Sequence, residues 1–120
     1  MPIIKIYSPD KCPSPDVLSS LCKKVTQVLQ LPADHAWAFW HRLTELEFHR
    51  PDWTVSDKPA APMVMMYCKS TYSEEQIEHV IWVIRNHLAD TCRCSENEIY
   101  ISCLRILPNH LLVRGDIWRG

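Results

Sequence analysis

Hydrophobic positions fall into two similar series along the chain. Each series opens with a short run of strand character that begins with proline, at residues 2–7 (PIIKIY) and again at 62–67 (PMVMMY). Each continues with apolar side chains at the i, i+3, i+4, i+7 spacing of a helix with one buried face. These are Val17, Leu18, Leu21, Cys22, Val25, Val28 and Leu29 in the first series, and Ile77, Val80, Ile81, Ile84 and Leu88 in the second. Each ends in an aromatic and β-branched run, at 35–48 and 98–106, which predicts another strand.

Both predicted helices have a recognisable start. Ser14 precedes Pro15, so Ser14 is expected to cap the first helix, with proline at a position where its missing N–H costs nothing. Ser73 stands three residues before Gln76, which is the spacing of a capping box for the second helix.

The two series predict an α+β fold built from two consecutive β-α-β units. Such a crossover makes the two strands of each unit parallel, with the helix on one face. The units would form one four-stranded mixed sheet with both helices on one side. We divide the single domain, 1–120, into unit one (2–48), a linker (50–61), unit two (62–106) and a C-terminal hairpin (108–120) that turns at Gly115-Asp116.

The run at 35–48 is apolar on both faces of the predicted strand. Trp37, Phe39 and Leu43 share one parity, and Trp40 and Leu46 share the other. A strand of this kind is normally buried on both faces, yet no further element remains in the chain to cover the second face. The pattern therefore indicates self-association through the sheet.

Composition narrows the classes of partner. The net charge is −1 and the basic residues are scattered, so no nucleic-acid footprint is predicted. No apolar run is long enough to span a bilayer and no signal peptide is evident, which favours the cytoplasm. The six cysteines form no CxxC pair and are expected to be free, and Cys22, Cys68 and Cys103 are expected to belong to the core. A metal site at His87, Cys92 and Cys94 lacks a fourth ligand, so neither a metal nor a cofactor is expected.

Pro2 is the residue with unusual chemistry. Removal of the initiator Met would leave a free secondary amine at the head of the first unit. An α-amino group ordinarily titrates near 7.7–8.0, and apolar burial or a nearby cation lowers that value. Such an amine could take a proton from carbon next to a carbonyl and return it elsewhere. Pro62, which heads the second unit, is an ordinary imide and cannot act as a base.

Met1-Pro2 with the following strand, the helix start at Ser73 and the stretch Ile99-Tyr100-Ile101-Ser102 resemble the tautomerase superfamily. This family includes macrophage migration inhibitory factor, 4-oxalocrotonate tautomerase and malonate semialdehyde decarboxylase, and the likeness is greatest to a bacterial branch. The resemblance covers nearly the whole chain. It implies a homotrimer with sites at subunit boundaries, an isomerase activity on a small carbonyl substrate, and Pro2 as the general base.

Strand direction suggests which residues accompany Pro2. If the two units run antiparallel, Lys69 and Arg105, at the ends of the second unit's strands, lie at the Pro2 end and could stabilise an enolate. The start of the second strand, with His35 and Trp37, lies there too. By resemblance, Tyr100 enters the site from a neighbouring subunit.

The resemblance also has departures. His35 stands where malonate semialdehyde decarboxylase has its catalytic aspartate, and Trp37 where 4-oxalocrotonate tautomerase has an arginine. The decarboxylase's arginine pair is replaced by residues 69–72 (KSTY). A lysine is a poor substitute for the bidentate grip of arginine on a carboxylate. Two alternatives therefore stay open: a non-catalytic homotrimeric binding protein that keeps the fold, and a thiol- or metal-dependent function of Cys92 and Cys94.

Overall fold

The strands and helices follow the predicted order. The computed structural model describes residues 1–44, 46–49 and 61–120. The elements are β1 (Ile3–Ser8), α1 (Val17–Val28), β2 (Trp37–Arg42), β3 (Met63–Lys69), α2 (Glu74–Cys92), the 3₁₀ turn η1 (Glu96–Glu98), β4 (Tyr100–Ile106), β5 (Leu111–Val113) and β6 (Asp116–Trp118).

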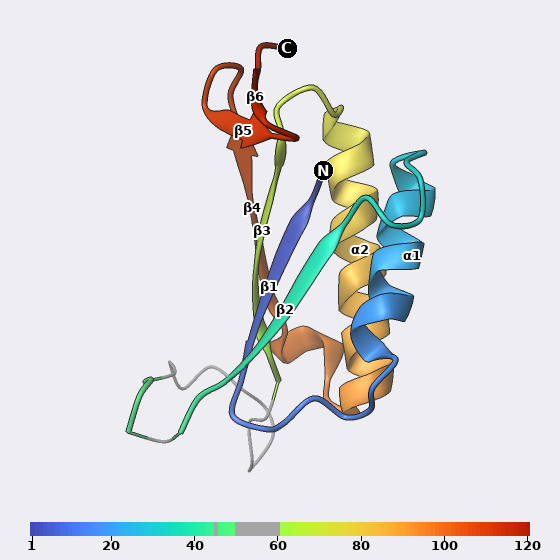
Figure 1. Ribbon diagram of the computed structural model, residues 1–120. Helices are drawn as coiled ribbons and strands as arrows, with labels where there is room; N and C mark the ends of the chain where they lie inside the picture. Colours follow the sequence, from blue (N-terminus) through green and yellow to red (C-terminus); the bar gives the residue numbers. More distant parts are fainter. Residues whose placement is uncertain (45, 50–60) are drawn as a thin grey trace.

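The main sheet has the strand order β2-β1-β3-β4. Strand β1 runs parallel to β2 and β3 runs parallel to β4, whereas the central pair β1 and β3 is antiparallel. Both helices lie on one face of this sheet (Figure 1). The α+β class, the mixed four-stranded sheet and the antiparallel relation of the two units are confirmed.

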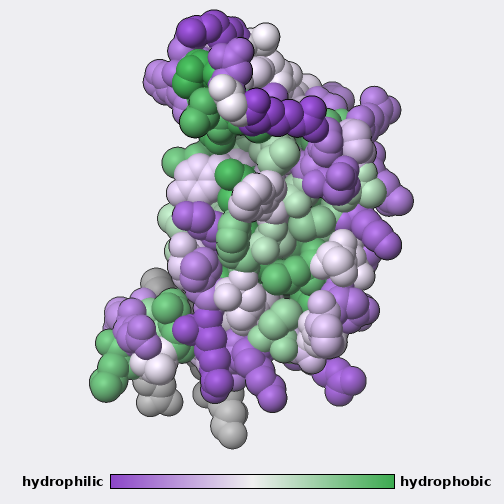
Figure 2. Space-filling view, in the orientation of Figure 1, coloured by the Kyte–Doolittle hydropathy of each residue, from purple (hydrophilic) through white to green (hydrophobic). Residues whose placement is uncertain are grey.

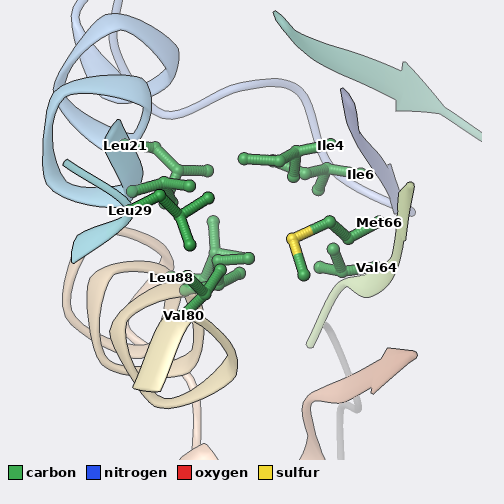
Figure 3. Packing of buried hydrophobic residues seen from close by; sticks show 10 residues of the cluster. Ile4, Ile6, Leu21, Leu29, Val64, Met66, Val80 and Leu88 are labelled. Carbon is green, nitrogen blue, oxygen red and sulfur yellow. The ribbon is translucent and has the colours of Figure 1, made fainter. Parts of the chain in front are cut away.

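The core lies between that face and the two helices (Figure 3). Alternate residues of β1 and β3, together with the apolar stripes of α1 and α2, are almost fully removed from solvent because strand side chains alternate between faces. The cluster comprises Ile4, Ile6, Leu21, Val25, Leu29, Val64, Met66, Val80, Ile84 and Leu88. Burial of each large side chain contributes about 1.5–3 kcal/mol relative to its exposure. The helical stripes read from the sequence thus mark the buried faces correctly.

The capping residue was predicted correctly for α2 and wrongly for α1. The Ser73–Gln76 capping box is present, with the Gln76 amide donating to Ser73 Oγ over 3.1 Å and the Ser73 amide donating to Gln76 Oε1 over 2.9 Å. Ser14 does not cap α1; the cap position is Asp16, which makes no side-chain capping bond. The Ser14 hydroxyl instead donates to the Asp16 carboxylate over 2.6 Å, because this local bond competes with capping.

Two strands are shorter than predicted. Strand β2 ends at Arg42 rather than near residue 48, since Glu47 accepts hydrogen bonds from both the amide and the hydroxyl of Thr44 and closes a turn. Leu46, in this turn, is 98% exposed. Strand β4 begins at Tyr100 because Glu96–Glu98 forms a 3₁₀ turn whose start is capped by Ser95.

The face of the sheet away from the helices carries large apolar side chains that the chain itself does not cover. Trp37, Phe39, Met63, Tyr100 and Leu104 are all exposed. The chain itself therefore leaves the outer side of β2 uncovered, as the sequence pattern indicated, and only Ala38 and Trp40 of this strand pack against the core. Figure 2 views the molecule from the edge strand β2, and hydrophobic residues occupy the middle of this view.

A hairpin of β5 and β6 lies beyond the end of β4, near the N-terminus (Figure 1). Its turn is Arg114-Gly115, one residue earlier than predicted, and both residues have positive φ, 53° and 81°. Two successive positive φ values are what a two-residue turn needs to match the twist of its strands. The predicted linker lies outside the described residues except for Ala61, which is buried. In the part of the chain that is described, no helix is long and apolar enough to cross a membrane.

Candidate active site

Pro2 lies at the head of the central strand β1, and its ring is among the side chains less than 2% exposed. Its carbonyl accepts a hydrogen bond from the Trp37 amide over 3.0 Å. Because β1 and β2 are parallel, both begin at this end of the sheet, and because β3 is antiparallel to β1, it ends there. Pro2 is therefore enclosed by the start of β2 and the end of β3.

The amino group at this end of the chain is in surroundings that disfavour its charge. Burial lowers the pKa of the Met1 amino group below its usual 8.0, and the positive charge of Lys69 lowers that pKa further. The nearby Cys68 thiol acts in the opposite direction and is the smaller influence. A neutral amine, which is the form able to accept a proton, is thereby favoured.

Lys69 and His35 flank the position of Met1 on either side. Ile3 pairs with Trp37 in β2 and with Tyr67 in β3, so two residues further out His35 and Lys69 are level with Met1. The Lys69 ammonium also makes a cation–π contact with the hairpin, because its Nζ lies 4.9 Å from the ring centre of Trp118.

His35 contacts an arginine from the hairpin. Arg114 Nη2 lies 2.9 Å from His35 Nε2. A guanidinium can only donate, so Nε2 accepts and the proton of this imidazole is on Nδ1. Arg114 and Trp118 thus connect β5 and β6 to the two residues that flank the N-terminus.

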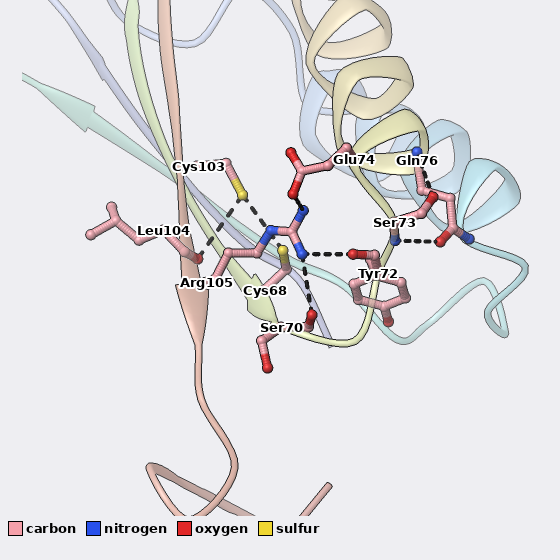
Figure 4. A network of polar contacts seen from close by, with 9 residues as sticks. All are labelled: Cys68, Ser70, Tyr72, Ser73, Glu74, Gln76, Cys103, Leu104 and Arg105. Atoms are coloured by element: carbon pink, nitrogen blue, oxygen red, sulfur yellow. Dashed lines mark hydrogen bonds and ion pairs between the residues drawn. The ribbon is translucent and has the colours of Figure 1, made fainter.

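Arg105 is at the same end of the sheet but points toward the helix side (Figure 4). Its Nη1 donates to the carbonyls of Ser70 and Tyr72 over 3.2 and 2.6 Å, and its Nη2 pairs with Glu74 at 2.9 Å. These contacts hold the β3–α2 loop at the start of α2. The Arg105 guanidinium, which was predicted to contact the substrate, is instead hydrogen-bonded to backbone carbonyls of its own chain.

Tyr100 lies at the opposite end of the sheet from Pro2 of the same chain. It pairs with Met63, whereas Ile3 pairs with Tyr67, four residues further along β3. Four residues of strand correspond to about 13 Å. Tyr100 therefore cannot serve the Pro2 of its own chain, and its phenol ring is exposed.

An apolar cavity of about 450 Å³ lies beside Tyr100 at this far end. It is lined mainly by outer-face residues of β1 and β3 and by residues that follow β1 and β2, among them Tyr7, Met63, Met65, Leu43 and Phe48. The sequence analysis did not predict this cavity, because it arises where segments far apart in the chain meet.

Comparison with known proteins finds no family model and no curated protein that matches the sequence. Solved structures match closely in shape. A fused 4-OT in an asymmetric trimer has a TM-score of 0.83 at 12% identity, over 96% of this chain and 94% of that one. The macrophage migration inhibitory factor of Trichinella spiralis has a TM-score of 0.71 at 15% identity, over 97% and 99%. FG41 malonate semialdehyde decarboxylase inhibited by 3-bromopropiolate has a TM-score of 0.70 at 14% identity, over 92% and 87%.

The chain has the tautomerase fold. At these identities the likeness is one of architecture, and the chemistry has to be argued from the residues. Within this tautomerase fold, the structure brings Pro2, Lys69, His35 and Trp37 to one end of the sheet and separates Tyr100 from them.

Sequence reasoning missed Arg114 and Trp118 at the Pro2 end of the tautomerase fold. The sequence predicts the hairpin that carries them, but nothing in its local pattern indicates which end of the sheet the hairpin covers. A second cation close to the N-terminus could have been suspected only from that packing.

The cysteines remain thiols in the structure. All six are free, with Cys68 buried and the others partly buried. Among the described residues, no three histidine, cysteine or carboxylate side chains are grouped so that they could hold a metal ion. Burial raises the pKa of Cys92 to about 11, which makes this thiol a weak nucleophile at neutral pH.

Proposed function

We propose that this protein is a tautomerase-like isomerase in which Pro2, freed by removal of Met1, is the general base for a small keto or enol substrate. One observation carries the proposal. The Met1 amine, one residue before the Pro2 nitrogen, lies in a partly buried position between the strand end that carries Lys69 and the strand start that carries His35, and its charged form is disfavoured there.

The chemistry requires few groups. The neutral Pro2 nitrogen takes the proton from carbon next to the carbonyl, and the electron pair moves onto the carbonyl oxygen. In the proposed reaction the Lys69 ammonium stabilises the enolate, and the protonated amine then returns the proton to complete the isomerisation. Arg114 offers a second cation, held by His35, for an anionic group of the substrate.

We also propose that the active form is a homotrimer and that Tyr100 of a neighbouring subunit completes each site. Support comes from the exposed apolar outer face of the sheet and from the 4-OT structures of the same fold, which are trimers. The separation of Tyr100 from its own Pro2 is consistent with a contribution across a subunit boundary. Six free cysteines favour a reducing compartment, so we expect a cytoplasmic protein.

The experiment is ketonisation of phenylpyruvate and of 2-hydroxymuconate by four proteins: wild type, Pro2→Ala, Pro62→Ala, and a chain extended at its N-terminus so that Pro2 becomes an imide. A positioned general base contributes about 10²–10⁴-fold in rate, so the extended chain should lose at least about 100-fold. Pro62 heads β3 and is equally buried, which makes Pro62→Ala the matched control that should retain activity. Equal rates for the wild-type and extended proteins would exclude Pro2 as the base.

The second candidate is a non-catalytic homotrimeric binding protein. It is favoured by the engagement of Arg105 in the β3–α2 loop and by the placement of the apolar cavity away from Pro2. The intact mass of the purified protein distinguishes the two readings, because a retained Met1 blocks the nitrogen and supports this second candidate.

A further inference from the structure

Two thiols meet between β3 and β4, one strand away from Pro2. Cys68 Sγ and Cys103 Sγ are 3.5 Å apart, within hydrogen-bonding distance for sulfur. Both point to the helix side of the sheet, where the Arg105 guanidinium lies close to them (Figure 4). The proposed isomerase chemistry does not use this thiol pair.

The surroundings of the two thiols are unequal. Cys68 is fully buried, whereas Cys103 is partly exposed. Charge is therefore less costly on Cys103, and the buried Cys68 keeps its proton and donates it toward Cys103. This hydrogen bond is the largest influence on Cys103 and lowers its pKa, while partial burial acts in the opposite direction; the positive charge of Arg105 lowers the pKa and the negative charge of Glu74 raises it. The same bond, together with burial, raises the pKa of Cys68.

Apart from its contact with Cys68, the Cys103 thiol has only a weak hydrogen-bond partner in the described ranges of the chain. The sole further acceptor recorded for Cys103 Sγ among the described residues is the Leu104 carbonyl, 4.0 Å away. Burial raises the pKa of Cys22 and of Cys92, so these thiols are less reactive. A partly exposed thiol whose thiolate accepts a hydrogen bond from a neighbouring thiol is more reactive than these two.

We propose that Cys103 is a second nucleophile of this protein, a modification site for electron-poor alkenes and alkynes, with Cys68 as its proton donor. In the reaction the Cys103 thiolate forms a carbon–sulfur bond to the β-carbon of a conjugated carbonyl compound. The π electrons of the carbon–carbon multiple bond move onto the α-carbon and carbonyl oxygen. The α-carbon then takes the Cys68 proton, which water replaces. No oxidant and no leaving group is needed.

Strand register favours addition over a disulfide. Cys68 pairs with Arg105 and Cys103 pairs with Met66, so the two cysteines are diagonal neighbours offset by two residues. Strand spacing and rise place such Cα atoms about 8 Å apart, beyond the ~7 Å that a disulfide spans. The thiols can share a proton but cannot join without movement of the strands.

The test is limited labelling with N-ethylmaleimide between pH 5 and 9, with peptide mapping of every cysteine. The hydrogen bond from Cys68 enlarges the thiolate fraction of Cys103, and for each tenfold gain in that fraction the weaker nucleophilicity of a less basic thiolate leaves a gain in rate of about threefold. We therefore expect Cys103 to react faster at pH 7 than Cys12, another partly buried thiol. In Cys68→Ala, labelling of Cys103 should slow and its pH profile should move upward. Cys22→Ala is the control and should leave Cys103 labelling unchanged.

Two labelling results would overturn the proposal: labelling of Cys103 no faster than Cys12 in the wild type, or an unchanged Cys103 profile in Cys68→Ala. If that variant does not fold, Cys68→Val, which keeps an apolar side chain at this buried position, replaces it, and the wild-type comparison with Cys12 stands in any case. A Cys68–Cys103 disulfide in the purified protein would also contradict it. The inference is independent of the proposed function, since it concerns no residue of the isomerase step. An adduct formed with 3-bromopropiolate must accordingly be mapped to Pro2 or Cys103, with Cys103→Ser as the comparison.

Discussion

Replacement of Arg105 by methionine separates a structural role from a substrate-binding role. Methionine keeps most of the apolar stem and removes the donors to the Ser70 and Tyr72 carbonyls and to Glu74. A hydrogen bond from a charged donor contributes about 1.5–3 kcal/mol, and since the Arg105 side chain is 26% exposed, two such bonds at the lower limit give about 3 kcal/mol. The Glu74 side chain is 96% exposed, so its ion pair adds only about 0.5 kcal/mol.

The assay is thermal and urea unfolding at one fixed protein concentration, with Glu74→Gln as the matched control. For a domain of this size, about 3 kcal/mol corresponds to a fall in Tm of roughly 12 °C, against about 2 °C for the control. Amide hydrogen exchange through local opening should accelerate in the β3–α2 loop of Arg105→Met, in addition to the faster exchange of core amides that follows from the lower global stability. Equal losses in the two variants would show that the ion pair, not the carbonyl contacts, provides the stability. Unchanged stability with an increased KM would instead assign Arg105 to the substrate.

Two further predictions follow from named contacts. Lys69→Gln removes a positive charge that lowers the pKa of the N-terminal amine, so this pKa should rise. Acylation of the amine should therefore reach half its maximal rate at a higher pH than in the wild type, whereas Lys5→Gln, the control, should leave this midpoint unchanged. A downward shift of the midpoint in Lys69→Gln would contradict the electrostatic argument. His87→Leu removes the side chain whose Nε2–H donates to the Val17 carbonyl over 2.9 Å and joins α2 to α1, so the free energy of unfolding should fall by about 1–3 kcal/mol in urea. Loss of an equal amount in Lys24→Met, which removes only the 3.0 Å contact to Nδ1, would show that the carbonyl bond is not the important one.

Sequence reasoning succeeded where neighbours along the chain decide the structure. The Ser73 capping box depends on residues three apart, and it formed as predicted. The prediction for Ser14 was wrong for an equally local reason, since the Asp16 carboxylate competes for its hydroxyl. The excess length predicted for β2 has the same kind of cause, because the side chain of Glu47 closes a turn that a hydrophobic pattern does not register.

The candidate site could be predicted only in part. That Lys69 and His35 would lie near Pro2 followed from strand direction, and the register bears out this placement, although it does not test their roles. Arg105 also lies at the expected end of the sheet, but its side chain points to the helix-covered face and is held there by the β3–α2 loop. Strand parity alone could not show that these carbonyls would be within its reach.

What the sequence by itself determined is the set of elements and their buried faces, because periods of 3.6 and 2 residues are properties of the local chain. It also determined that a proline amine could head the first unit. Tertiary structure alone decided which side chains from distant segments meet: Arg114 with His35, Trp118 with Lys69, and Cys68 with Cys103. Contacts of this kind depend on how the strands pair and on where the hairpin packs, and those arrangements are selected by the whole core at once rather than by any single segment.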